Sequence, residues 1–219
     1  MKCPLCNSSA HFLISGENRE YWLCSVCRAI FVPEGFHIPR EEEVKRYLQH
    51  ENSIDNDGYV QMFQNKINIL KDYDIQSALD YGCGYEPVLK TLLEKEGIHT
   101  TGYDPNFFPD TCLDSFYDLV ISTETFEHLR NPAEELERVS SKVKPGGYLA
   151  IMTRFYPTEE NAFSDWYYKR DPTHIIFYCS QTFEWIAEKT GFKLIFNNEH
   201  DFVVLNNSLS REAGSNLVP

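Results

Sequence analysis

The sequence lacks any apolar run close to the ~20 residues that a membrane-spanning helix needs. It also lacks a cluster of lysine and arginine, and its 33 acidic and 20 basic residues give a formal net charge of −13. Such a charge repels phosphate backbones, which argues against binding to nucleic acid. The first residues, MKCPLCNSSAHF, contain no hydrophobic stretch typical of a secretory signal, so we expect a cytoplasmic protein.

The composition is that of a folded protein. Hydrophobic residues make up 42% of the chain and charged residues 24%, which supplies a packed core and excludes a disordered chain. A length of 219 residues has room for one full-sized domain and a small appendage. We predict three parts: a small unit at 1–32, a linker and helix at 33–57, and the main domain at 58–219.

Four of the seven cysteines form two CxxC pairs, Cys3 with Cys6 and Cys24 with Cys27. In a reducing compartment, paired CxxC units usually indicate a metal site. The spacing C-x2-C-x17-C-x2-C is that of a four-thiolate zinc ribbon, and a tetrahedral ion with four sulfur ligands has no open position for a substrate. The sequence therefore predicts a structural zinc ion in residues 1–32, because so short a segment needs metal to fold.

Predicted strands and helices alternate from residue 76 onward. This pattern is typical of an open, mostly parallel sheet covered on both faces. The last two predicted strands, at 192–197 and 201–206, are too close for a crossover helix. We therefore expect them to form an antiparallel hairpin at the sheet edge. Two further helices are predicted before the sheet, at 41–52 and 59–73.

The segment ALDYGCGYEP, residues 78–87, places Gly82 and Gly84 just after the first strand of this sheet. Asp104 ends the second strand. Glycines at the carboxyl end of a parallel strand let a ligand approach the backbone, and a carboxylate there can accept both hydroxyls of a ribose. NAD and S-adenosylmethionine fit these features equally well.

Three features of the loop favour S-adenosylmethionine over NAD. Glu86 stands in the first helical turn, where it would repel a pyrophosphate. Pro87 replaces the third glycine of the dinucleotide fingerprint. Asp80, directly before the loop, disfavours phosphate but suits the cationic amino acid end of S-adenosylmethionine.

With these residues in place, the chain resembles the class I S-adenosylmethionine-dependent methyltransferases over about residues 58–206. The matching motifs are LDYGCG, GYDP, FYDLVIST and VKPGGYLAIMT. The resemblance implies an α/β fold: a Rossmann-like, mostly parallel seven-stranded sheet with an antiparallel C-terminal hairpin, here with the small N-terminal zinc ribbon added. It also implies cofactor-binding roles for five residues: Asp80, Gly82, Gly84, Asp104 and Thr123. Of these, Thr123 would face the reaction centre.

The stretch TETFEHL, residues 123–129, follows the fourth strand and contains Glu124, Glu127 and His128. His174 follows in the aromatic segment WYYKRDPTHIIFY. The E-x-x-E-H spacing with a later histidine resembles the metal site of small-RNA 2′-O-methyltransferases and of quinone-biosynthesis O-methyltransferases. There a divalent ion binds the acceptor hydroxyls and lowers their pKa. In the alternative, these residues position the substrate without metal, and His128 or His174 acts as the general base.

Together these features predict methyl transfer from S-adenosylmethionine to a small-molecule acceptor, with oxygen as the first choice of acceptor atom. The candidate catalytic residues are Glu124, Glu127, His128 and His174. Two alternatives remain. An RNA-modifying methyltransferase would have a basic stripe that joins the ribbon to the active site. A catalytically inactive zinc-ribbon interaction protein would have no need of the carboxylates Asp80 and Asp104.

Overall fold

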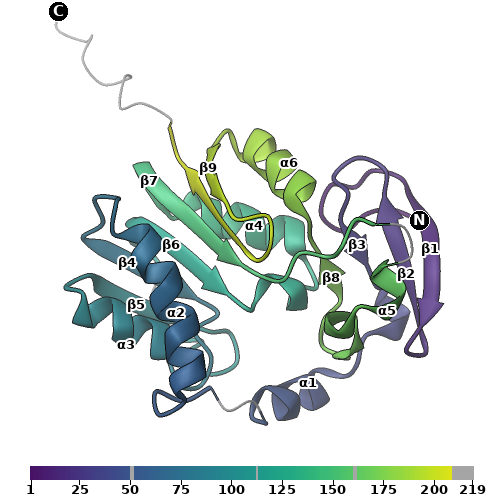
Figure 1. The fold of residues 1–219 in the computed structure, drawn as a ribbon, viewed down its shortest axis with the longest axis horizontal. Coiled ribbons are helices and arrows are strands. Elements are labelled where there is room, and N and C mark those ends of the chain that lie inside the picture. Colours follow the sequence, from purple (N-terminus) through teal and green to yellow (C-terminus); the bar gives the residue numbers. More distant parts are fainter. Residues whose placement is uncertain (50–51, 112, 160–161, 209–219) are drawn as a thin grey trace, which may run out of the picture.

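The computed structural model describes residues 1–49, 52–111, 113–159 and 162–208 of the chain. Two sheets lie next to each other, a small N-terminal sheet and a larger central sheet with helices around it (Figure 1). Two residues of the helix predicted at 41–52, His50 and Glu51, lie outside these ranges. Within the described residues, no helix is long and apolar enough to cross a lipid bilayer.

The central sheet has the strand order β5-β4-β6-β7-β10-β9. Its first four strands are parallel, and β10 is antiparallel to both of its neighbours. This confirms a mostly parallel sheet that ends in an antiparallel hairpin. The strands are β4 (Ser77–Tyr81), β5 (His99–Tyr103), β6 (Tyr117–Thr123), β7 (Val143–Met152), β9 (Lys193–Asn197) and β10 (Phe202–Asn206).

The expected number of seven strands is wrong for the described residues, where the central sheet has six. The chain passes from the end of β5 to the start of β6 through residues 104–116, of which Cys112 lies outside the described part. A parallel crossover needs a dozen or more residues in addition to the strand it connects. The segment is therefore too short to add a seventh strand beyond β5.

Helices cover both faces of the central sheet because its strands carry apolar side chains on both sides. On β6, Leu119 and Ile121 pack with α2 and α3, whereas Val120 points to the opposite face and packs with α4 and α6. The four helices are α2 (Asp57–Leu70), α3 (Val88–Lys95), α4 (Pro132–Ser141) and α6 (Ser180–Thr190).

The N-terminal sheet contains a strand that comes from far along the chain. Its order is β1-β2-β3-β8, and β8 is antiparallel to β3 through the pairs Ile30–Phe177 and Phe31–Ile176. In Figure 1 the green β8 accordingly joins the purple N-terminal strands. The strands are β1 (Ala10–Gly16), β2 (Arg19–Cys24), β3 (Ile30–Phe31) and β8 (Ile176–Phe177). The cysteine-rich segment is therefore joined to the segment that carries His174.

Short helices surround the carboxyl ends of the parallel strands. The helix α1 contributes Tyr47, whose ring packs edge-on against His128 at a centroid distance of 5.1 Å. Arg46, on the same helix, forms an ion pair of 3.1 Å with Asp171. These helices are η1 (Glu34–Phe36), α1 (Arg40–Tyr47), η2 (Phe126–His128), α5 (Ala162–Asp165) and η3 (Tyr167–Arg170).

Candidate active site

A cavity of about 730 Å³ opens at the carboxyl ends of β4, β5 and β6. This is the edge of an open α/β sheet where ligands usually bind. All but one of the candidate catalytic and cofactor residues line the cavity; the exception is Glu127, which is fully buried behind it. The lining candidates are Asp80, Gly82, Gly84, Asp104, Thr123, Glu124, His128 and His174.

The glycine loop forms one wall of the cavity, and Gly82 leaves no space for a side chain. Its φ angle of +83° is in the left-handed region, and a Cβ atom there would lie 2.2 Å from the Oγ1 atom of Thr125. Thr125 follows β6 and donates a hydrogen bond to the carbonyl of Thr123 at 3.0 Å. The close contact between the two loops fixes how the β4 and β6 ends face each other.

Asp80 is the last but one residue of β4 and is almost fully buried. Its Oδ2 atom accepts a hydrogen bond of 3.1 Å from the backbone N–H of Lys90, whereas its Oδ1 atom is buried without a hydrogen-bond partner. Burial raises the pKa of this carboxyl to about 7. If a ligand placed a cationic group next to Oδ1, the ionised carboxylate of Asp80 would form a charge-assisted hydrogen bond with that group.

Asp104 holds the loops that follow β4 and β5. Its Oδ2 atom accepts a 3.2 Å hydrogen bond from the backbone of Gly84, and its Oδ1 atom accepts bonds of 2.8 and 3.2 Å from the backbone of Asn106 and Phe107. A carboxylate has about four acceptor positions, so these three bonds orient it and leave it able to accept one more donor.

Glu86 has a structural contact that the sequence pattern does not reveal. Its Oε1 atom accepts hydrogen bonds from the hydroxyl of Ser53 at 3.2 Å and from the backbone of Ile54 at 3.1 Å. The side chain thereby ties the glycine loop to the turn before α2. An acidic residue at this loop position is thus explained by a contact within the protein.

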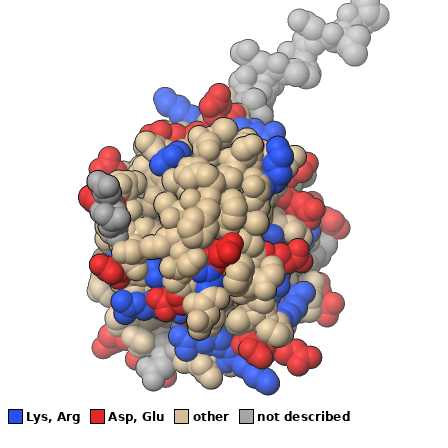
Figure 2. All heavy atoms as spheres, turned by 90° about the vertical axis from the view of Figure 1, so that its right-hand side faces the viewer, with Lys and Arg blue, Asp and Glu red and all other residues tan. Residues whose placement is uncertain are grey.

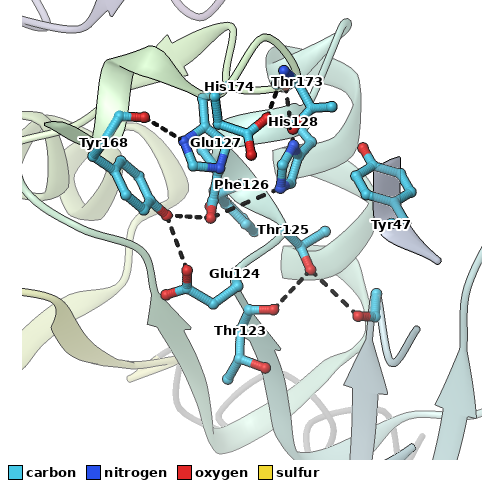
Figure 3. Close-up of polar contacts among 12 residues, drawn as sticks. Tyr47, Thr123, Glu124, Thr125, Phe126, Glu127, His128, Tyr168, Thr173 and His174 are labelled. Atoms are coloured by element: carbon cyan, nitrogen blue, oxygen red, sulfur yellow. Dashed lines mark hydrogen bonds and ion pairs between the residues drawn. The ribbon is translucent and has the colours of Figure 1, made fainter. Parts of the chain in front are cut away.

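Glu124 and Glu127 both contact the hydroxyl of Tyr168 (Figure 3). Glu124 has a positive φ of 49°, a backbone conformation that is sparsely populated for residues other than glycine and that clusters at functional sites. Burial, followed by the charge of Glu127, raises the pKa of Glu124, and burial raises the pKa of Glu127. A phenol has one hydrogen to donate, so the two contacts require that one carboxyl group carries a proton.

The two imidazoles are held by backbone carbonyls (Figure 3). The Nδ1 atom of His174 donates to the carbonyl of Tyr168 at 2.7 Å, and the Nδ1 atom of His128 donates to the carbonyl of Thr173 at 3.0 Å. Burial lowers the pKa of both rings, to about 3 for His174, so both are neutral at pH 7. A neutral ring that donates from Nδ1 has its lone pair on Nε2.

The carboxylate of Glu127 lies beside both rings (Figure 3), and the Nε2 atom of His128 is 3.9 Å from its Oε1 atom. Ligand atoms of Glu127, His128 and His174 lie within 4.8 Å of one another, and the Oε2 atom of Glu127 is buried without a hydrogen-bond partner. Two imidazoles and a carboxylate suit a divalent transition metal. The fourth residue of the predicted set, Glu124, reaches this group only through the hydroxyl of Tyr168.

The four paired cysteines also come together. All four sulfur atoms lie within 4.8 Å of one another, with distances of 3.6 Å between Cys3 and Cys27 and 3.3 Å between Cys6 and Cys24. Three of the four side chains are buried. Four sulfurs gathered around one point fit a tetrahedral zinc ion.

Three further residues line the cavity: Tyr47, Tyr168 and Arg154. The sequence offered Tyr168 as one of several aromatics that could wall an acceptor pocket and Arg154 as positive charge for an anionic acceptor, but it gave no sign of Tyr47. Tyr47 precedes the sheet and Tyr168 stands among several neighbouring aromatics, so no spacing rule separates them from core residues. The density of aromatic residues around His174 was the only available signal for Tyr168. Tyr168 is the most informative of the three because it connects the two acidic side chains.

Comparison with known proteins agrees with this arrangement. A family model described as "Methyltransferase domain" matches residues 37–196, which is most of the chain. No curated protein matches the sequence significantly.

Solved structures show the same fold at low sequence identity. An O-methyltransferase family protein from Burkholderia thailandensis superposes with a TM-score of 0.53 and 13% identity, covering 78% of this chain and 68% of that one. An S-adenosylmethionine-dependent methyltransferase from Archaeoglobus fulgidus gives a TM-score of 0.50 at 20% identity, over 67% of this chain and 94% of that one. Magnesium protoporphyrin IX methyltransferase from Synechocystis PCC 6803, with bound S-adenosylhomocysteine, gives 0.50 at 13% identity, over 76% and 93%. The chain belongs to the class I S-adenosylmethionine-dependent methyltransferases.

Proposed function

We propose that this enzyme transfers the methyl group of S-adenosylmethionine to an oxygen atom of a small-molecule acceptor. The observation that carries the proposal is the cavity itself, which connects the glycine loop and Asp80 to Glu124, His128 and His174. One side of this cavity suits a cationic nucleoside cofactor, and the other suits a hydroxyl group that must lose a proton.

The cofactor side is argued from charge. The unpartnered Oδ1 atom of Asp80 would accept a hydrogen bond from the ammonium group of S-adenosylmethionine, and Asp104 would accept one from the ribose. Asp104 would suit the ribose of either cofactor, whereas Asp80, next to the glycine loop, would repel the pyrophosphate of NAD. Gly82 and Gly84 would lie against the cofactor because they expose their backbone.

The acceptor side is argued from proton transfer. The sulfonium methyl group is already activated, so the enzyme has to position the acceptor in line and remove its proton. Glu124, at the end of β6, shares the hydroxyl of Tyr168 with Glu127. Such a pair of carboxyl groups with raised pKa values can take up one proton near neutral pH.

A divalent ion at Glu127, His128 and His174 is a second component of the proposal. The fit rests on the lone pairs of the two Nε2 atoms and on the unpartnered Oε2 atom of Glu127. The carbonyls of Tyr168 and Thr173 orient the two rings. When bound, such an ion lowers the pKa of a coordinated hydroxyl group. For the ribbon we propose a structural zinc ion held by Cys3, Cys6, Cys24 and Cys27.

Surface charge supports a small acceptor rather than RNA. The face seen in Figure 2, which includes the ribbon, has an uncharged centre with acidic and basic side chains interspersed around it. An RNA path from ribbon to active site would need continuous positive charge. The net charge of −13 adds to the repulsion.

The test begins with calorimetric titration of the zinc-loaded protein with S-adenosylmethionine and with NAD. We expect S-adenosylmethionine alone to bind, in the micromolar range, and Asp104→Ala to lose this binding. Turnover of neutral and anionic hydroxyl acceptors is then screened with and without Mn²⁺. Binding of NAD, or of neither ligand, would overturn the cofactor assignment. Methylation of RNA but of no small molecule would favour the RNA alternative, and cofactor binding without turnover of either kind would favour the inactive interaction protein.

A further inference from the structure

Arg19, at the start of β2 in the ribbon, reaches into the segment that carries Tyr168 and His174. Its side chain is buried, with 6% of the residue exposed. The guanidinium group donates to four backbone carbonyls of residues 169–174. The acceptors are Lys169, Asp171 at 3.1 Å, Pro172 at 3.2 Å and His174 at 3.0 Å. A planar group with five donors is suited to hold several carbonyls in one arrangement.

Two other carbonyls, that of Thr173 within this segment and that of Tyr168 directly before it, bind the histidines. The carbonyl of Tyr168 accepts from Nδ1 of His174 and the carbonyl of Thr173 accepts from Nδ1 of His128. Four carbonyls of residues 169–174 therefore bind Arg19, and two carbonyls interspersed with or adjoining them hold the two imidazoles. If the segment lost the arrangement that Arg19 holds, the two histidine contacts would lose their geometry.

Other ribbon residues strengthen the same connection. The hydroxyl of Tyr21 donates to the carbonyl of Lys169 at 3.2 Å. The buried ammonium group of Lys169 forms an ion pair of 3.1 Å with Glu17, in the turn between β1 and β2. Both contacts involve the same short part of the ribbon as Arg19. The ribbon thus supports one side of the cavity through hydrogen bonds as well as through the β3–β8 pairing.

We propose that Arg19 is a positioning residue of the acceptor site: by holding the carbonyls of residues 169–174 it sets the tautomer and orientation of His128 and His174. The proposal rests on the proposed function in one respect, namely that the two Nε2 lone pairs serve acceptor or metal binding. It assigns the ribbon a part in the active site in addition to its own fold.

The first test uses the wild-type protein with zinc in the ribbon and no other divalent ion added. A long-range ¹H–¹⁵N correlation spectrum of the histidine side chains reports which ring nitrogen carries the proton. We expect both His128 and His174 to give the pattern of a neutral ring protonated at Nδ1. A spectrum with either ring protonated at Nε2, or exchanging between tautomers, would overturn the proposal without any variant.

The second test compares Arg19→Met and Arg19→Lys with Arg170→Met, an exposed arginine in the same segment. In both Arg19 variants we expect the single-tautomer pattern to be lost and backbone hydrogen exchange in residues 168–175 to rise at least tenfold. Lysine does not restore the pattern, because a single ammonium group cannot span four carbonyls. Arg170→Met is expected to match the wild type in both measurements.

Binding of S-adenosylhomocysteine separates this proposal from the proposed function. We expect its dissociation constant to change less than twofold in the Arg19 variants, because the glycine loop does not contact Arg19. Unchanged histidine spectra and exchange in folded Arg19 variants would overturn the positioning role while leaving cofactor binding intact. Absence of binding in the wild type would instead contradict the proposed function.

Discussion

At the scale of single residues, Asp80 combines burial with an incomplete set of hydrogen bonds. Water is excluded from its carboxyl group, and one oxygen atom has no partner. Ionising a buried carboxyl group without a cationic partner is unfavourable, and this burial raises the pKa of Asp80 to about 7. A ligand that brings an ammonium group to this carboxylate must therefore also displace its proton at acidic pH.

The affinity for S-adenosylhomocysteine should consequently rise with pH. Between pH 5.5 and 8 we expect an increase of about 30-fold, because affinity falls tenfold per pH unit below the pKa of Asp80 and is constant above it. Calorimetry in two buffers with different ionisation enthalpies would detect the proton released on binding. An affinity independent of pH, with no proton release, would contradict a charged pairing at Asp80.

The variant Asp80→Asn is the matched control, and it should separate stability from binding. The raised pKa in the folded state means that the contribution of Asp80 to stability is fully present below pH 3.8 and is lost as pH rises through about 7. At pH 8 the ligand-free variant should therefore melt at a higher temperature than the wild type. Its affinity for S-adenosylhomocysteine should be weaker and no longer depend on pH.

Gly82 lies where the loop after β4 contacts the loop after β6, and this close contact can be tested by substitution. Gly82→Ala should abolish cofactor binding and lower the free energy of unfolding, because the new Cβ atom would meet Thr125 at 2.2 Å. Gly97→Ala is a matched control, since Gly97 has a φ of +84° but nothing within 4 Å. We expect the control to lose only about 1 kcal/mol, the cost of the left-handed backbone.

Chemical denaturation and calorimetry of both glycine variants would measure this difference. Equal losses in the two variants would show that backbone conformation alone matters at Gly82. Restoration of binding by the second substitution Thr125→Ala would identify the side-chain clash as the cause.

At the scale of structural elements, the ribbon and β8 form one unit, so metal in the ribbon should affect the aromatic segment. We expect one zinc ion per chain, and its removal by a chelator or by Cys24→Ser should raise hydrogen exchange in both 1–32 and 174–178. The reason is that the β3–β8 pairing depends on an ordered β3.

Metal analysis together with hydrogen exchange would test this coupling. The glycine loop at 80–88 serves as the internal control, because its contacts are with β5, Thr125 and the turn before α2. Increased exchange in 1–32 without any change in 174–178 would show that β8 is held by the main domain alone.

The elements also show which parts of the fold can be read from local sequence. The regions of α3, α4 and α6 and of the parallel strands were predicted because apolar periodicity, Pro132 and Gly191 act within a few residues. The two-residue strands β3 and β8 were missed. Their pairing joins Ile30 to Phe177, and no local pattern encodes a contact across so much chain.

At the scale of the whole molecule, the net charge of −13 governs long-range interactions. We expect no binding to single-stranded or double-stranded RNA at 0.15 M salt, because the counterion release that drives such binding needs clustered positive charge. Fluorescence anisotropy with labelled RNA would measure this. Submicromolar affinity that weakens steeply with salt would contradict the expectation and favour an RNA substrate.

The sequence by itself determined the cofactor class and the cysteine-rich ribbon. Gly82, Gly84 and the four paired cysteines lie within short motifs, and Asp80 and Asp104 stand at the ends of neighbouring parallel strands. Short spacings and strand ends fix such positions before any tertiary contact is known.

Only the tertiary structure decided how the acceptor side is built. It placed Tyr168 between Glu124 and Glu127, gathered ligand atoms of Glu127, His128 and His174 within 4.8 Å of one another, and brought Arg19 to the backbone of residues 169–174. These contacts join residues that are far apart in the chain, and they depend on how buried donors and acceptors find partners once the two sheets have packed. A linear pattern can supply the residue types, whereas the folded chain alone sets the directions of their hydrogen bonds.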